Sequence, residues 1–168
     1  PDYTYPKGRW YTETAWGRQY MKHDYPENPD LMNEYFKPIA RWTDALQNDF
    51  AARANWCVKS YEEANHPPFV KLTNPLEIKA KPGQEIQLDA TASSDPDGDK
   101  LSFSWWQYQE AGTYTGIVNI DNSSSPKASF IVPAEASKDQ SIHIICEVKD
   151  NGTPPLTRYQ RVIVKIDP

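Results

Sequence analysis

The chain has 168 residues, which suits one or two small domains. Its net charge is −5, with acidic and basic residues well mixed, and this disfavours binding to nucleic acid or to an anionic membrane surface. No apolar run approaches the length of about 18 residues that predicts a membrane-spanning helix, and 15 prolines favour short strands and extended segments over long helices.

The first segment reads as extended loop. The chain opens at Pro1 without an initiator methionine or a charged-then-apolar leader, which indicates a processed product or a piece of a longer protein. Up to about Asp30 it is rich in Tyr, Trp and Pro and shows no periodicity, so we expect it to pack through its aromatic rings. Trp10 and Trp16 are candidate ligand-stacking side chains there.

A single long helix is predicted next, from Asn33 to Trp56, because apolar residues recur mostly at three- and four-residue steps. Pro38 falls early, so the helix proper is expected to start close to it. Such a helix is not stable alone in water. We expect its apolar face to pack on the following module and on a domain missing from this chain. That face comprises Phe36, Ile39, Ala40, Leu46, Phe50 and Ala54.

The second half of the chain alternates apolar and polar residues with the period of a β-strand. An Asn-His-Pro-Pro linker at 65–68 precedes it, and Gly-, Pro- and Asp-rich turns separate the strands. Six or seven short strands in about 100 residues, with a tryptophan on the third, predict an immunoglobulin-like antiparallel β-sandwich. The predicted fold is therefore mainly β, with the sandwich over 67–168 and the loop, helix and linker over 1–66. The predicted inward-facing residues are Ile86, Leu88, Ala90, Leu101, Phe103, Trp105, Ala128, Phe130, Val132, Ile142, Ile144, Cys146, Val148, Val162, Val164 and Ile166.

Two cysteines, Cys57 and Cys146, are too few for a disulfide framework and match no metal-binding spacing. Two interpretations stay open. The pair either bridges the two halves of the chain or, as we favour, consists of two buried thiols that act as small hydrophobic side chains.

The acidic turn at 95–99 is the first candidate site. Asp95, Asp97 and Asp99 place three carboxylates on a turn bent by Pro and Gly, and carboxylate oxygens are the ligands that Ca²⁺ prefers. The spacing is not that of an EF-hand loop. The alternative is a solvated turn in which the aspartates cap their own backbone.

No catalytic constellation is predicted. The glutamates that a glycoside hydrolase would need as a pair lie in predicted loops or the linker, with no cleft-forming architecture around them. None of the three histidines has a second metal ligand at close spacing. The sequence also lacks a Gly-x-Ser-x-Gly turn and a Gly-rich phosphate loop.

The aromatic side chains of the third strand are the second candidate site. If Trp105 faces the core, the strand period sends Trp106 and Tyr108 to the opposite face. Two neighbouring rings on a sheet surface suit a flat sugar-binding platform, on which the C–H face of a pyranose stacks. The alternative, which the unpartnered helix favours, is that the N-terminal segment or the helix covers this face and makes Trp106 an interdomain anchor.

A family resemblance adds to this reading. The run Gln-Asn-Asp-Phe-Ala-Ala-Arg at 47–53 and the Asn-His-Pro-Pro run at 65–68 resemble the domain junction of a bacterial family of secreted, cellulose-binding proteins. These proteins carry an N-terminal nucleoside-hydrolase-like domain and a C-terminal immunoglobulin-like domain. Trp-Gly-Arg at 16–18 is more loosely similar to a segment late in the first domain. The acidic turns at 95–99 and 150–156 also resemble polycystic-kidney-disease-type (PKD) and cadherin-like modules.

The resemblance implies a secreted or cell-surface accessory module whose partners are a polysaccharide and an upstream hydrolase-like domain, to which residues 1–66 would contribute the tail. The aspartate cluster of nucleoside hydrolases has no counterpart here, so no catalytic residue carries over. Two other functions stay open. One is a cadherin-like spacer stiffened by calcium at the acidic turn, with no glycan binding. The other is part of an enzyme whose pocket uses N-terminal aromatics such as Trp10 or Trp16.

Overall fold

A computed structural model describes residues 3–4, 9–12, 23–24 and 40–167. The chain divides into two compact units, Pro1–Thr43 and Asp44–Pro168. In the first unit the three short strands β1 (Tyr3–Thr4), β2 (Arg9–Thr12) and β3 (His23–Asp24) pair antiparallel in the order β1-β2-β3. The second unit contains the helix α3 (Thr43–Trp56) and all the remaining strands.

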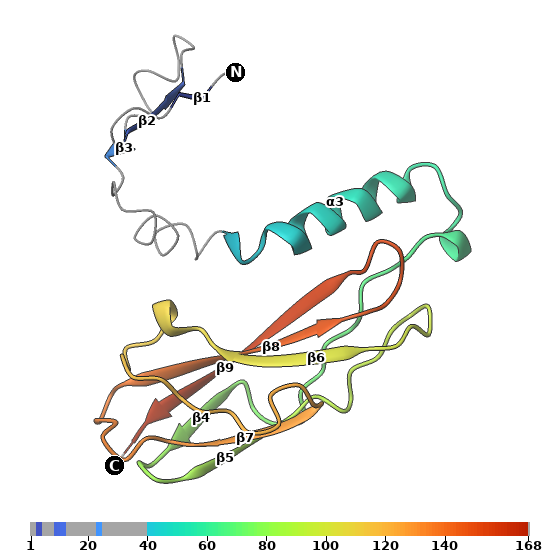
Figure 1. Cartoon of the computed structure of the whole chain (residues 1–168). Helices are drawn as coiled ribbons and strands as arrows, with labels where there is room; N and C mark the ends of the chain where they lie inside the picture. Colours follow the sequence, from blue (N-terminus) through green and yellow to red (C-terminus); the bar gives the residue numbers. More distant parts are fainter. Residues whose placement is uncertain (1–2, 5–8, 13–22, 25–39, 168) are drawn as a thin grey trace. The chain divides into compact units, whose positions relative to one another are not determined.

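The second unit is a sandwich of two sheets (Figure 1). One sheet has four strands in the order β4-β9-β8-β6, and the other pairs β5 with β7. The strand bounds are β4 Glu77–Ala80, β5 Glu85–Asp89, β6 Ser102–Gln107, β7 Lys127–Ile131, β8 Ser141–Lys149 and β9 Thr157–Ile166. Two short 3-10 helices, η1 (Tyr61–Glu63) and η2 (Gln109–Ala111), lie in the connections. The strand pattern of the sequence predicts this immunoglobulin-like architecture.

The hydrophobic core forms between the two sheets from alternate residues of their strands. Trp105 on β6 lies in this core, and its indole N–H donates to the carbonyl of Ser125 at 2.9 Å. The predicted inward-facing set is confirmed: all of its members are buried in the core except Leu101 and Phe103, which pack against it partly exposed.

The strand β4 was not predicted, although Ile78 and Ala80 alternate with polar residues. It pairs parallel with β9 along the edge of the larger sheet, with Ile78 opposite Val164 and Ala80 opposite Ile166. An edge strand of four residues contains too few alternations to be distinguished from a loop by sequence pattern alone.

The helix α3 begins at Thr43, and Arg41 and Trp42 before it form a turn, so the helix is shorter at its start than predicted. The predicted residues 33–39 lie outside the described part of the chain. The part of the prediction that packs this face on the sandwich is wrong: Leu46 and Phe50 are 65% and 76% exposed, while Ala52 is the buried residue of the helix. Packing of these residues on a domain missing from this chain stays a prediction.

A polar contact joins α3 to the sandwich. Asp49, on the half-buried side of the helix, accepts a hydrogen bond from Arg158 Nη1 on β9 at 3.2 Å and one from Arg53 Nε at 2.7 Å. The two basic side chains hold the pKa of Asp49 below its ordinary value, Arg53 more strongly than Arg158, and against the opposing effect of burial. The Asp49–Arg158 ion pair, rather than Leu46 or Phe50, therefore connects the helix to β9.

The linker after α3 is fastened to the sandwich as well. Trp56 Nε1 donates to the carbonyl of Asn65 at 2.8 Å, and Asn65 Nδ2 donates to the carbonyl of Pro154 at 2.8 Å. These contacts attach the helix and linker to the second unit, which begins at Asp44. The predicted domain boundary at residue 66 stays a prediction.

Both cysteines are free. Cys146 is buried on β8, and its burial, with a smaller effect of the Glu147 charge, raises its pKa to about 12, so it acts as the predicted small hydrophobic side chain. Cys57 is exposed just after α3, where burial had been expected. Within the described ranges, none of the helices has the length and apolar composition needed to cross a membrane.

Candidate functional site

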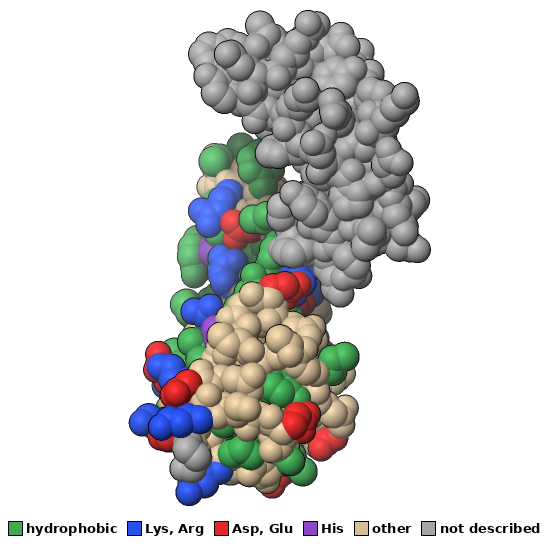
Figure 2. Space-filling model, turned by 90° about the vertical axis from the view of Figure 1, so that its left-hand side faces the viewer, with side chains coloured by type: hydrophobic (Ala, Val, Ile, Leu, Met, Phe, Trp, Pro, Cys, Tyr) green, Lys and Arg blue, Asp and Glu red, His purple; other side chains and the backbone are tan. Residues whose placement is uncertain are grey.

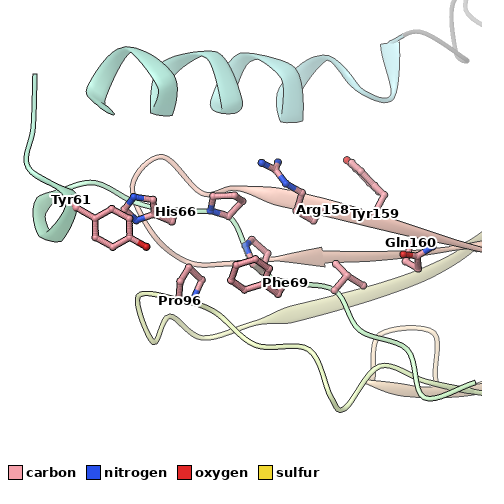
Figure 3. Close-up of a pocket in the computed structure, with 10 residues that line it drawn as sticks. Tyr61, His66, Phe69, Pro96, Arg158, Tyr159 and Gln160 are labelled. Carbon is pink, nitrogen blue, oxygen red and sulfur yellow. The ribbon is translucent and has the colours of Figure 1, made fainter. Parts of the chain in front are cut away.

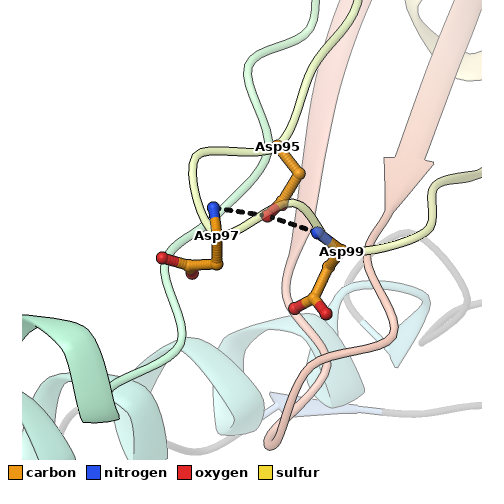
Figure 4. A group of neighbouring side chains, drawn as sticks. All are labelled: Asp95, Asp97 and Asp99. Carbon is orange, nitrogen blue, oxygen red and sulfur yellow. Dashed lines mark hydrogen bonds between the residues drawn. The ribbon is translucent and has the colours of Figure 1, made fainter.

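The three aspartates of the turn before β6 converge. Each of Asp95, Asp97 and Asp99 offers a carboxylate oxygen that lies within 4.8 Å of the other two (Figure 4). The turn is held by Asp95, whose Oδ1 accepts the backbone N–H groups of Asp97 at 2.9 Å and of Asp99 at 3.1 Å. Gly98, at φ +81°, supplies the left-handed backbone that this turn requires. The predicted backbone-capping role of Asp95 is therefore present, and it leaves Oδ2 unused.

A second acidic turn, between β8 and β9, adds Asp150 to this end of the sandwich. Asp150 is only 3% exposed. Its Oδ1 accepts hydrogen bonds from Asn65 Nδ2, Gly152 N and Leu156 N at 3.2, 3.0 and 2.9 Å. A Cβ on Gly152 would overlap the side-chain amide of Asn65, so the turn and the linker pack closely.

Two carboxylate oxygens at this end are buried without a donor. Neither Asp95 Oδ2 nor Asp150 Oδ2 has a hydrogen-bond partner among the described residues. Buried carboxylate oxygens without donors are costly unless a cation neutralises them. These carboxylate oxygens thus suit a hard cation such as Ca²⁺, which is bound by oxygen ligands from carboxylates, carbonyls and water.

The charges at this end repel one another. Burial, followed by the charges of Asp95, Asp150 and Asp97, raises the pKa of Asp99 above 3.8. The folded state then holds the Asp99 proton more tightly than the unfolded state does. The stabilisation that this proton gives, measured as free energy of unfolding, is therefore fully present below pH 3.8 and is lost as the pH rises through the raised pKa. At neutral pH, and without a cation, Asp99 is a source of instability.

Asp97 is tied to the linker. Its Oδ2 accepts the backbone N–H of His66 at 2.6 Å, and His66 Nδ1 lies 3.0 Å from its Oδ1. The His66 ring stacks with Tyr61, at a centroid distance of 3.9 Å, and with Trp56, at 5.8 Å. The acidic turn therefore connects through one aromatic stack to the end of α3.

The candidate platform residues Trp106 and Tyr108 lie together at the outer edge of the larger sheet. Their rings meet edge to face, with centroids 5.9 Å apart and an interplanar angle of 65°, and both are partly buried. Trp106 Nε1 donates to Glu147 Oε2 on β8 at 3.3 Å. Their flat faces are therefore not both presented side by side, as a simple two-ring platform would have them.

Glu147 continues this polar and aromatic surface onto β9. It lies opposite Tyr159 in the strand register, and the pKa of Tyr159 is raised to about 12, first by burial and then by the Glu147 charge. The outer face of the sheet thus carries Trp106, Glu147 and Tyr159 across three adjacent strands.

The remaining residues to place are the N-terminal tryptophans and the glutamates of the loops and linker. Trp10 lies on β2 opposite His23, and Trp16 lies outside the described residues. Two glutamates of the loops and linker make structural hydrogen bonds: Glu135 accepts the Tyr114 hydroxyl at 2.6 Å, and Glu63 accepts the N–H and hydroxyl of Ser60.

A groove that sequence reasoning missed lies between the linker and β9 (Figure 3). Its volume is about 400 Å³. In Figure 3, Arg158 and Tyr159 extend from β9 toward α3, while Phe69 and Pro96 lie on the side away from the helix. The one sequence signal for it is the Pro-Pro-Phe run at 67–69, which favours an extended chain with an outward ring.

The position of Asp150 was recoverable from the strand order. The turn at 95–99 precedes β6 and the turn at 150–155 follows β8, and these two strands pair antiparallel with Ser102 opposite Lys149. The start of one therefore meets the end of the other, and Asn151 Oδ1 accepts the N–H of Lys100 at 2.7 Å.

Comparisons with known proteins agree with this fold. Residues 85–166 match the family model described as the C-terminal domain of cellulose-binding protein Sde0182. A solved nucleoside hydrolase-related hypothetical protein from Saccharophagus degradans, associated with carbohydrate metabolism, has a TM-score of 0.73 and 36% identity over 88% of this chain and 35% of that chain. The present chain therefore spans about a third of that protein's length.

A PKD domain from the KIAA 1837 protein aligns at 25% identity over 54% of this chain and 79% of that one, with a TM-score of 0.38. The curated proteins contain no match. The family model and the 36% identity confirm the resemblance predicted from the junction runs.

Proposed function

We propose that this chain, whose residues 85–166 belong to the family of the Sde0182 cellulose-binding protein C-terminal domain, is a non-catalytic module that binds polysaccharide. In this proposal it is secreted and accompanies a hydrolase-like domain, as the likeness to a nucleoside hydrolase-related protein of about two and a half times its length suggests. The family match is the observation that carries the proposal.

The surface of the described residues supports a neutral ligand. On the face drawn in Figure 2, basic and acidic side chains are interspersed among uncharged ones, so this face offers no single-sign patch for a polyanion. Trp106 and Tyr108 supply a partly exposed aromatic edge on the outer sheet. Such an edge is able to contact the apolar face of a sugar ring while Glu147 accepts a hydroxyl.

The test of the platform is retention on insoluble cellulose and on soluble glucans. We expect Trp106→Ala to weaken binding by about tenfold or more, equivalent to about 1.4 kcal/mol or above, because it removes the ring and the donor to Glu147. Trp106→Phe keeps the ring face and is expected to retain most of the binding. Ile131→Ala, at an exposed position on β7 in the other sheet, is the control for a general loss of apolar surface.

Two outcomes would count against this proposal. Failure of the wild-type chain to bind any glycan would remove the function. Unchanged retention by a folded Trp106→Ala variant would remove the platform and leave the function to another surface.

A second function is favoured by the unsatisfied carboxylates. We propose that Asp95, Asp97, Asp99 and Asp150 bind Ca²⁺ and that the ion stiffens the junction between the linker and the sandwich. The support is the pair of buried, donor-free oxygens Asp95 Oδ2 and Asp150 Oδ2 and the raised pKa of Asp99. Water and backbone carbonyls would complete the six to eight oxygen ligands that Ca²⁺ takes.

The test of the calcium site is thermal unfolding with and without the ion. With an affinity of about 0.1–1 mM, as in extracellular modules, 10 mM Ca²⁺ is expected to raise the free energy of unfolding by about 1.5–3 kcal/mol. The midpoint then rises by several degrees relative to a chelator. Mg²⁺ at the same concentration is the matched ion control, and a midpoint equal in Ca²⁺ and chelator would contradict the site.

Asp99→Asn separates repulsion from metal binding. The amide removes one negative charge, so in chelator at neutral pH the variant is expected to melt no lower than the wild type. In Ca²⁺ it is expected to lose most of the stabilisation, because one anionic ligand is gone.

A further inference from the structure

The groove between the linker and β9 has the composition of a small-ligand site. Three aromatic side chains, Tyr61, Phe69 and Tyr159, line it together with Arg158 and Gln160. Tyr61 and Phe69 are 64% and 65% exposed, which is unusual for large apolar rings that lie side by side with proline. The volume of about 400 Å³ falls within the range of ligand pockets, roughly 300–1,000 Å³.

The linker wall of the groove is held in place before any ligand binds. On the linker side, Tyr61 stacks on His66, and Asp97 fixes His66 through its backbone N–H and its ring. Phe69 exchanges backbone hydrogen bonds with Ser94, at 2.8 Å from its N–H and 3.1 Å to its carbonyl. Pre-ordered walls lower the entropy lost on binding.

The positive charge on the lining is already compensated. Arg158 is paired with Asp49 at 3.2 Å, and His66 Nδ1 already lies 3.0 Å from the Asp97 carboxylate. An anionic ligand would compete with these carboxylates, whereas an uncharged one would not. The groove is therefore suited to a neutral ligand.

The lining of the groove also carries polar groups that are able to form hydrogen bonds with sugar hydroxyls. The bonds from Arg158 to Asp49 and to the carbonyl of Thr157 both come from Nη1, and a guanidinium carries five N–H donors. Gln160 makes only a long contact of 3.5 Å, from its side-chain amide to the carbonyl of Arg161. A groove lined by both flat rings and polar side chains matches a pyranose, which has an apolar C–H face and a rim of hydroxyls.

We propose that this groove is a binding subsite for an uncharged pyranose chain, with Tyr61 and Phe69 stacking on sugar rings and Arg158 and Gln160 donating to hydroxyls. The inference rests on the proposed polysaccharide-binding function and assigns it a site separate from Trp106 and Tyr108.

The test is calorimetric titration of the whole 168-residue chain with cellohexaose. Phe69→Ala and, as a second variant, Tyr61→Ala are each expected to weaken binding about tenfold, and Gln160→Ala severalfold. Ile131→Ala removes an exposed apolar side chain from the opposite sheet and is expected to leave the affinity unchanged. Melting curves establish that each variant is folded; the rings are exposed, so little change is expected.

An oligogalacturonate of the same length is the charged comparison, and it is expected to bind more weakly than cellohexaose. Tighter binding of the uronate would overturn the assignment to a neutral ligand. If the wild type binds cellohexaose and folded Phe69→Ala and Tyr61→Ala bind equally well, the groove assignment is wrong while the function stands. If the wild type binds no glycan, both proposals fall.

Discussion

Replacing Phe130 by alanine is expected to lower the free energy of unfolding by about 3–5 kcal/mol. Phe130 is fully buried on β7, opposite Ile86 on β5, and it is among the largest side chains at the centre of the core. Its truncation loses the transfer free energy of the ring and leaves a cavity that close-packed neighbours fill only in part. Since domains of this size are stable by about 5–15 kcal/mol, the loss is a large share of the total.

Urea denaturation followed by circular dichroism measures this loss. Ile131→Ala, one residue along the same strand, is the matched control, because its side chain is exposed and its truncation should change the stability by about 0.5 kcal/mol or less. Similar midpoints for the two variants would mean that the two sheets do not enclose Phe130.

Asp150→Ala is expected to destabilise the protein by about 3 kcal/mol, because it leaves three N–H donors without their acceptor. The donors come from Asn65 in the linker and from Gly152 and Leu156 in the β8–β9 turn. The same measurement of unfolding by urea applies, in chelator, so that no ion contributes.

Asp150→Asn separates the two roles of this carboxylate. The amide keeps Oδ1 as the acceptor of the three bonds and removes the negative charge. We expect near-wild-type stability in chelator and a much smaller response to Ca²⁺. Equal destabilisation by alanine and asparagine would show that the charge, rather than the hydrogen bonds, supports the turn. A full calcium response in the asparagine variant would remove Asp150 from the proposed site.

The strand content of this protein was predictable because each strand carries its own signal. Ile86 and Leu88, or Ile142 and Ile144, alternate with polar neighbours, and a period of two makes one face apolar whatever the rest of the chain does. The same rule placed Trp105 in the core and Trp106 outside it.

The helix shows where such reasoning fails. Leu46 and Phe50 lie one turn apart and were expected to pack on the sandwich and on a domain missing from this chain. Both are exposed here, and Asp49 makes the contact with Arg158 on the sandwich. Helical periodicity identifies an apolar face but not the surface that faces it, because that depends on how elements distant in sequence are arranged.

The candidate sites divide in the same way. The turn at 95–99 was recognisable from its residues alone, since three carboxylates on one short turn are close in any fold. The pairing of Asp150 with the linker and that of His66 with the acidic turn were not recognised, because Asn65 lies 85 residues from Asp150 and Asp97 lies 31 residues from His66 along the chain. The groove at Phe69 was missed because it forms only where the linker meets β9.

By itself, then, the amino-acid sequence determined the immunoglobulin-like sandwich, its core and the acidic turn, because these follow from local period and composition. Only the tertiary structure decided which distant segments are in contact. It places Asp150 beside the acidic turn and stacks His66 with Trp56 and Tyr61. It also places Arg158 where it pairs with Asp49 and lines the groove. The physical reason is that burial, charge and stacking depend on distances between segments, and strand pairing, not sequence order, sets those distances.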